Sequence, residues 1–303
     1  MLENLTTREE HACFGGTVGS YAHHSSACDA EMRFAVYVPP QAAKGPVPAL
    51  YYLAGLTSTE ETFMTKGGAQ RAASENGLML VAPDTSPRGL GLPGEDEDWD
   101  VGSGVGFYLD ATTEPWSRHY KMYTYLTREL PAVMAKHFPA SGAQGIFGHS
   151  MGGHGALTLA LKNQDLYASV SAFAPIAAPM RAPWGEKAFY SYLGPDKETW
   201  REHDASELVR ERPFADGRPI LVDQGTADQF LEEQLYPEVL EDACREIGQP
   251  LALRWHEGYD HGYYFIHLYR RSRTTPRGGS LRPDVRLLAR LRRSSRGNLL
   301  HLL

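Results

Sequence analysis

The stretch GIFGHSMGGHGAL (145–157) holds a serine between glycines, after a strand-like segment and before a helix-like one. Residues 148–152 match the pattern Gly-x-Ser-x-Gly, which is weak evidence alone because it also arises by chance. The context strengthens it, since a strand-to-helix corner forces strained backbone angles on its central serine. Gly148 and Gly152 lack the Cβ atoms that would collide at such a corner. We predict that Ser150 is a nucleophile beside a helix N-terminus; the alternative is a glycine-rich turn without chemistry.

A serine hydroxyl becomes an effective nucleophile only with a histidine base that a carboxylate orients. In sheets with this corner, the acid and the histidine follow the serine along the chain, on loops after later strands. The predicted strand PILVDQG is followed by Asp228, and the last predicted strand is followed by His261. Asp223 and His256 lie within these two strands, where we interpret them as structural, with Asp223 kept as the alternative acid. The sequence therefore predicts a nucleophile, an acid and a base in the expected chain order.

Acyl transfer also needs N–H donors for the oxyanion that forms on the substrate. The corner supplies one of them, the backbone amide of Met151. The second donor is expected on the loop after an early strand, and the segment AGLTSTE (54–60) occupies that place. We choose the Leu56 N–H as this donor. Loss of one such donor typically lowers the rate by about 10²- to 10³-fold.

Segments typical of strands and of helices alternate along the body of the chain. Apolar runs rich in β-formers predict buried strands, and capped amphipathic stretches predict helices. Strands are predicted at 32–40, 48–55, 78–84, in a segment that ends at Gly148, and at 168–175, 219–225 and 251–258. Helices are predicted at 58–77, at 118–138 with a kink or restart at Pro131, from about Met151, and near 232–248. This alternation predicts one α/β domain with a mostly parallel central sheet and helices on both faces. Irregular insertions are expected near 85–117 and 176–215.

The composition is that of an ordinary globular protein, with 303 residues, 42% hydrophobic and 22% charged. A chain of this length can bury a core without a disulfide or a metal. Its three cysteines, Cys13, Cys28 and Cys244, form no CxxC pair, which argues against a zinc site and favours a reducing compartment. The N-terminus lacks the features of a signal peptide, and no segment reaches the roughly 20 apolar residues of a membrane span. We therefore expect a soluble, cytoplasmic protein without a metal.

The charge balance changes abruptly near the C-terminus. Residues 268–303 contain ten arginines, one acid (Asp284) and no lysine, whereas the whole chain carries a net charge of −7. Such a tail could bind nucleic acid or an anionic membrane, but the acidic body of the chain argues against nucleic acid as the main partner, and we expect neither nucleic acid nor a membrane as a partner. The tail shows no sustained apolar period and is rich in residues that break helices and strands. We interpret 1–267 as the catalytic domain and 268–303 as a disordered or foreign extension.

Eight motifs together resemble one known family. They are YYLAGLTSTEETF, VAPDTSPRG, GEDEDWDVGSGVGFYLDAT, GHSMGGHGALTLALKN, SAFAPI, WGEKAF, DQGTADQFL and GYDHGYYFI. From about Cys13 to Ile266 the chain looks like the S-formylglutathione hydrolases, also called esterase D. The resemblance implies an α/β-hydrolase fold and cleavage of S-formylglutathione to formate and glutathione in formaldehyde detoxification. It also implies side activity on short acyl esters, no cofactor, a cytoplasmic location and, often, a homodimer.

The catalytic residues that the resemblance implies coincide with those chosen from the strand ends. The family's triad falls on Ser150, Asp228 and His261, and its oxyanion donors fall on Leu56 and Met151. Two alternative functions stay open at this point. One is a broad carboxylesterase or an acyltransferase that uses the same triad. The other is a catalytically silent binding protein on a hydrolase scaffold, against which the intact triad argues.

The chain departs from the family at Ser58, two residues after the leucine of the oxyanion loop. The family frequently carries a cysteine at this place, and that cysteine is associated with sensitivity to thiol-modifying reagents. We therefore expect the activity of this chain to resist such reagents. After the motif GYYFI, the family continues into a C-terminal helix of mixed charge, and the arginine-rich tail stands in its place here.

Five side chains in the insertions are candidates for contacts with the substrate. Trp99, Phe107 and Tyr108 are candidates to close an acyl pocket over a small formyl group, although packing alone explains them equally well. Trp184 and Lys187 lie in the second insertion, where substrate contacts often arise. Lys187 is a candidate partner for a carboxylate of glutathione.

Two further groups of polar residues near these segments could suggest a metal site. The acidic run GEDEDWD (94–100) has consecutive carboxylates, which favour a solvated or lid-forming loop over a site for a hard cation. His149 and His154 flank the serine, and we expect them to pack in the core or in the turn. Neither group therefore predicts a metal ion.

Overall fold

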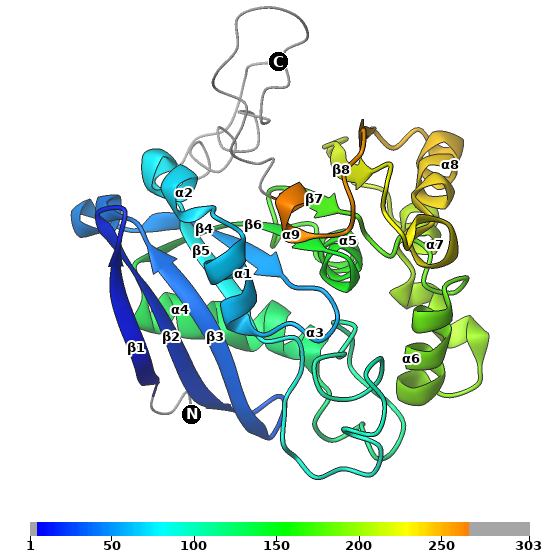
Figure 1. Cartoon of the computed structure of the whole chain (residues 1–303), viewed down its shortest axis with the longest axis horizontal. Coiled ribbons are helices and arrows are strands. Elements are labelled where there is room, and N and C mark those ends of the chain that lie inside the picture. Colours follow the sequence, from blue (N-terminus) through cyan, green and yellow to red (C-terminus); the bar gives the residue numbers. More distant parts are fainter. Residues whose placement is uncertain (1–4, 267–303) are drawn as a thin grey trace, which may run out of the picture.

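The computed structural model describes residues 5–266, and within them nine strands form one sheet with helices on both faces (Figure 1). The strand order is β1-β2-β3-β5-β4-β6-β7-β8-β9. β1, β2 and β3 pair antiparallel, β3 joins β5 antiparallel, and every neighbouring pair from β5 to β9 is parallel. The strands are β1 (Thr6–Cys13), β2 (Gly16–Ser25), β3 (Ala30–Val38), β4 (Val47–Leu53), β5 (Met79–Pro83), β6 (Ala140–His149), β7 (Val170–Phe173), β8 (Ile220–Gly225) and β9 (Leu251–His256). The mostly parallel α/β sheet predicted from the sequence is confirmed.

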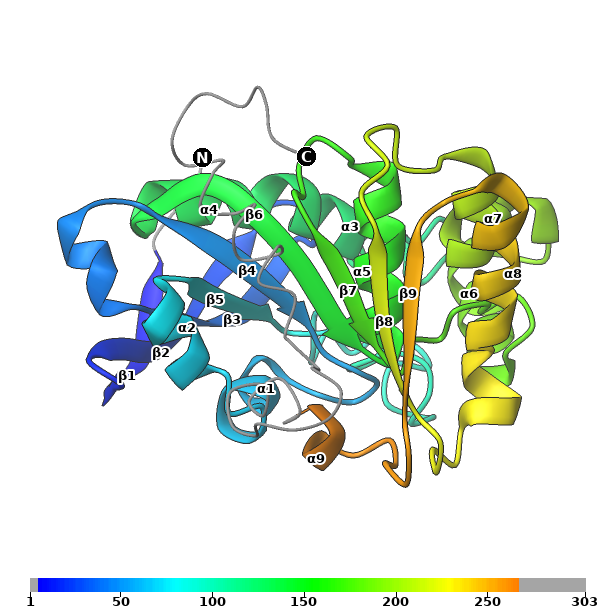
Figure 2. The ribbon, with the colours of Figure 1, turned by 90° about the horizontal axis from the view of Figure 1, so that it is seen from above.

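Helices cover the two faces of the sheet and its far edge. Figure 2 shows α1, α2 and α9 on one face, α3, α4 and α5 on the other, and α6, α7 and α8 beyond β9. The α-helices are α1 (Glu60–Lys66), α2 (Gln70–Asn76), α3 (Met122–Thr124), α4 (Leu130–His137), α5 (Met151–Lys162), α6 (Pro183–Leu193), α7 (Ala205–Glu211), α8 (Pro237–Ile247) and α9 (Tyr263–Ile266). None of the helices in the described part of the chain combines the length and the apolar character needed to cross a bilayer.

The middle of the sheet is buried from both sides. Every residue of β4 and β5 is buried, as their apolar runs predict, because helices cover both faces there. α5 is buried from Met151 to Leu161, so it packs as a core helix rather than as an amphipathic surface helix. Parallel strands end at the same edge of a sheet, so the loops after β4, β6, β8 and β9 gather on one side of the molecule. These are the loops on which the sequence places the catalytic residues.

Two predicted helices differ in detail from those in the structure. The segment 58–77 forms two short helices, because Gly68 has a φ of +61°, which interrupts a right-handed helix. The segment 118–138 becomes helical only at Met122 and passes through a π-helical turn before α4 begins. Pro131 lies just after this π-helical turn within a continuous helical segment, so the irregularity lies at the kink predicted there.

The first two strands were not predicted from the sequence. All but the last residue of β1 are exposed, so the strand carries no apolar alternation that could mark it. β2 is buried continuously only at residues 19–23, and its sequence there, GSYAH, has no run of apolar residues that would indicate a strand. The predicted tail at 268–303 lies outside the described residues.

Candidate active site

Ser150 lies at a strained corner between β6 and α5, as predicted. Its φ of 57° and ψ of −121° fall in a region that L-residues rarely adopt, and its amide donates to the Phe173 carbonyl at 3.0 Å. A Cβ on Gly148 would lie 2.1 Å from the Gly152 carbonyl oxygen, and one on Gly152 would lie 2.0 Å from that of Leu53. Only glycine fits at either place. The two glycines on either side of Ser150 therefore allow the backbone to approach closely enough to form this corner.

Asp228 and His261 form a hydrogen-bonded pair on the loops after β8 and β9. Nδ1 of His261 lies 2.7 Å from Oδ2 of Asp228, whose side chain is fully buried while that of His261 is 13% exposed. The same carboxylate accepts the Phe230 amide at 2.9 Å and the Gln224 side-chain amide at 3.3 Å. A carboxylate bound to Nδ1–H favours the tautomer whose Nε2 is free to accept a proton.

The two loops that carry this pair are fastened to each other. Thr226 and Ala227 donate their amides to the carbonyls of His256 and Tyr259, both at 3.0 Å. A Cβ on Gly225 would lie 2.2 Å from the Tyr259 oxygen, so the close approach of the loops requires glycine there. The separation of acid and base is thus fixed by backbone contacts.

The loop of the base lies against the serine corner. The ring of His149, which precedes Ser150, stands 4.4 Å from the ring of His261, centroid to centroid. Phe230 packs edge-on against the imidazole of His261 at 5.0 Å. The structure thus brings together the three segments that the sequence singled out. Phe230 was not among the predicted residues, although its place two residues after Asp228 was a usable signal.

Asp223, the alternative acid, takes part in a different cluster. Its carboxylate accepts two hydrogen bonds from Arg254, at 2.7 and 2.6 Å, and lies 2.6 Å from Nε2 of His256. All three residues lie on β8 and β9, so the cluster clasps the edge strand to its neighbour. This is the structural role expected for Asp223 and His256.

The predicted oxyanion loop runs beside Ser150. A Cβ on Gly55 would lie 3.2 Å from that of Ser150, which places the following residue, Leu56, next to the nucleophile. In the described part of the chain, the amides of Leu56 and Met151 donate to no carbonyl outside the regular helices and strands. Both therefore remain candidates for binding an oxyanion, and their role stays a prediction.

A polar network holds this loop from behind. The Ser58 carbonyl accepts from Thr85 Oγ1 at 2.7 Å and from Arg88 Nη2 at 2.8 Å, while Asp84 binds the same guanidinium. On the other side, the Tyr108 hydroxyl donates to the Ala54 carbonyl at 2.7 Å. Such anchoring keeps donors in place before the reaction begins, which is how oxyanion sites gain their effect.

The five candidate substrate residues fall into two groups. Phe107 and Tyr108 are buried: Phe107 packs on His154 and Phe189, and Tyr108 against Gly155. Their contacts support α5 and the oxyanion loop. Trp99 is 60% exposed and stands 5.5 Å from Trp184, which in turn packs on Phe230. A row of aromatic rings thus leads from the surface to His261.

Lys187 is bound within the protein. Its Nζ lies 3.0 Å from Asp98 and also pairs with Asp100, and these two carboxylates hold the pKa of Lys187 above its usual value. A carboxylate of glutathione would have to displace or share these partners. The proposed contact of Lys187 with the substrate is therefore left without support from the geometry.

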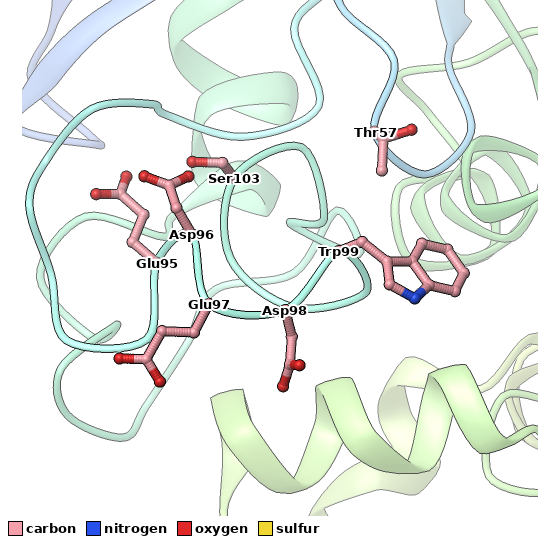
Figure 3. Close-up of a pocket in the computed structure, with 7 residues that line it drawn as sticks. All are labelled: Thr57, Glu95, Asp96, Glu97, Asp98, Trp99 and Ser103. Carbon is pink, nitrogen blue, oxygen red and sulfur yellow. The ribbon is translucent and has the colours of Figure 1, made fainter.

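The acidic run borders a cavity of about 470 Å³ beside the oxyanion loop (Figure 3). Residues 96–99 are exposed, as expected of a solvated loop. Glu95 is buried instead, because its carboxylate accepts three backbone amides of the segment 90–92, at 3.1, 2.6 and 3.3 Å. The cavity is lined by Thr57, Glu95, Asp96, Glu97, Asp98, Trp99 and Ser103.

Comparisons with known proteins agree with the fold. The family described as "Putative esterase" matches residues 25–273. The S-formylglutathione hydrolases of Mus musculus and Rattus norvegicus are 53% identical over 256 residues and 52% identical over 258, each covering 84% of this chain and 90% of the relative. The solved structure of an S-formylglutathione hydrolase from Agrobacterium tumefaciens has a TM-score of 0.84 and 51% identity, covering 87% of this chain and 95% of that one.

Fold, corner and family match together define an esterase with the α/β-hydrolase fold. Such enzymes cleave acyl groups through a nucleophile carried on a strand-to-helix corner. Within this class, the chain belongs to the S-formylglutathione hydrolase family. The resemblance stated from the motifs is confirmed.

Proposed function

We propose that this protein hydrolyses the thioester S-formylglutathione to formate and glutathione, with Ser150, His261 and Asp228 as its catalytic triad. The hydrogen bond of 2.7 Å between His261 and Asp228, beside the strained serine corner, is the observation that carries the proposal. The identity of about half of the residues with curated S-formylglutathione hydrolases supports the choice of substrate.

In the proposed mechanism, Nε2 of His261 takes the hydroxyl proton of Ser150 as its Oγ attacks the formyl carbon. Asp228 holds the imidazole in the correct tautomer and stabilises its charged form. The amides of Leu56 and Met151 bind the oxyanion of the tetrahedral intermediate. Glutathione then leaves as a thiolate that receives the proton from the imidazolium. Water, activated by the same histidine, hydrolyses the formyl-enzyme and releases formate.

Comparison of two substrates tests this proposal. We expect kcat/KM for S-formylglutathione to exceed that for a short-chain nitrophenyl ester by about 10²-fold or more, because the glutathione moiety adds binding energy remote from the reacting carbon. Initial rates under matched conditions give both values. Higher kcat/KM for the ester would favour the alternative function, a broad carboxylesterase or acyltransferase with side activity on the thioester.

A second expected result concerns thiol-modifying reagents. Burial raises the pKa of Cys28 and of Cys244 to about 12 and raises that of Cys13, so these thiols carry little reactive thiolate at neutral pH. Ser58 provides no thiol beside the oxyanion site. We therefore expect a maleimide to leave the activity largely intact, measured as residual turnover after incubation.

The matched variant for this experiment is Ser58→Cys, which should make the activity sensitive to the same treatment. Rapid loss of activity in the unaltered protein at low maleimide concentration would show that one of its own three thiols controls the site.

We further infer the setting in which the enzyme acts. The three cysteines are free, which agrees with a reducing compartment such as the cytoplasm. The proposed catalytic unit is 1–267, and the resemblance to the family suggests a homodimer as its assembly. Size-exclusion chromatography with light scattering measures that assembly directly.

A further inference from the structure

His149 is a buried histidine that the proposed mechanism does not use. It is the last residue of β6 and directly precedes Ser150; it is 5% exposed, and its Nε2 has no hydrogen-bond partner among the described residues. A buried imidazole nitrogen without a partner costs free energy, so an apolar side chain would be expected here if packing were the only requirement.

The contacts of His149 join the three parts of the site. Its ring lies 4.4 Å from that of His261, and it is hydrogen-bonded to the His261 backbone. Its Nδ1 would stand 3.6 Å from a Cβ on Gly55, in the predicted oxyanion loop. Through its own backbone, His149 is continuous with the nucleophile.

The surroundings keep this imidazole neutral. Burial lowers the pKa of His149 well below its usual value, and the neighbouring His261 lowers it further. The groups that face it are His261, which Asp228 binds from the far side, and Tyr263 of α9, whose ring is 5.9 Å away. A neutral neighbour does not repel the imidazolium that forms on His261 during turnover.

We propose that His149 is a positioning residue, which fixes the backbone and ring of the general base His261 relative to Ser150. The inference rests on the proposed triad. It assigns to the residue between Gly148 and Ser150 a function in alignment, which acts through the contact of its ring with His261.

His154 offers a matched control. It is 1% exposed, burial lowers its pKa to about 3, its Nδ1 is without a partner among the described residues, and it is hydrogen-bonded to the backbone of Phe107. Its ring contacts are with Phe107 and Phe189, at 5.6 and 6.2 Å. The two histidines thus share burial and polarity, and only His149 contacts the base.

The experiment compares three variants at position 149 with His154→Leu. An asparagine places its amide near the position of Nδ1, whereas a glutamine places it near Nε2 and a leucine has no donor. We expect His149→Leu and His149→Gln to lower kcat for S-formylglutathione by about 30- to 100-fold with little change in KM, as small misplacements of catalytic groups do. His149→Asn should recover most of this loss, and His154→Leu should retain kcat.

Two further measurements make the outcome decisive. The melting temperature of each variant reports folding, and the rate of labelling by a fluorophosphonate reports the reactivity of Ser150 without the thioester. If the unaltered protein is labelled but does not cleave S-formylglutathione, the proposed substrate is wrong and the labelling rates still test His149. The inference is overturned if His149→Leu is fully active, or if both leucine variants lose activity equally and in proportion to their melting temperatures. If His149→Leu does not fold, equal activity of the asparagine and glutamine variants overturns it.

Discussion

Ser150→Ala is expected to reduce kcat for S-formylglutathione by about 10⁵- to 10⁶-fold, the scale found when the nucleophile of a serine hydrolase is removed. The reason is chemical, since alanine has no oxygen with which to form a formyl-enzyme. Rapid-mixing measurements with a nitrophenyl ester should show an initial burst of nitrophenolate in the unaltered protein and none in the variant.

The fold should survive this change. Ser150 already lies at a φ of 57°, and its amide bond to Phe173 does not involve the hydroxyl, so an equal melting temperature is expected. A burst of normal amplitude in a folded Ser150→Ala protein would falsify the assignment of the nucleophile.

Asp228→Asn should lower kcat by about 10⁴-fold, because an amide in this place stabilises the wrong tautomer of the histidine. Oδ2 of Asp228 accepts from Nδ1 of His261 at 2.7 Å, and an asparagine that donates there leaves Nε2 protonated and unable to act as a base. Steady-state rates across neutral pH measure the loss, and KM should change little.

Asp223→Asn is the control for this prediction. Asp223 is equally buried and also bonds a histidine, but its partners Arg254 and His256 lie within the sheet. We expect this variant to melt at a lower temperature, because Arg254 loses its carboxylate, while the folded protein retains its kcat. Should the two variants lose kcat to the same extent, the acid would not be assigned to Asp228 alone.

Local signals in the sequence were sufficient to predict which loops would meet beside Ser150. Ser150, Asp228 and His261 each follow a predicted strand, and in a parallel sheet the carboxyl ends of the strands lie at the same edge. The order of the sheet's parallel strands was not needed for this step. The chain position of each loop alone determined which side of the molecule it would reach.

The orientation of side chains in the insertions could not be predicted in the same way. Lys187 binds Asp98 and Asp100, which are nearly ninety positions away in the chain, so the pairing exists only in the folded protein. Phe107 and Tyr108 both adopt positive φ angles, of 45° and 54°. Aromatic residues rarely adopt such angles, so the residue types do not predict this conformation. The burial of Glu95 depends on three backbone amides that a tight loop turns toward it.

β9 is an edge strand of the sheet, and none of its residues is fully buried. The hydrogen bonds of Asp223 with Arg254 and His256 hold it to β8. His261 follows this strand, whereas the nucleophile belongs to the interior. Segments with few buried contacts separate from a native structure before the whole molecule unfolds. On mild heating, the rate of turnover should therefore fall at temperatures at which the circular dichroism of the protein is still that of the intact fold.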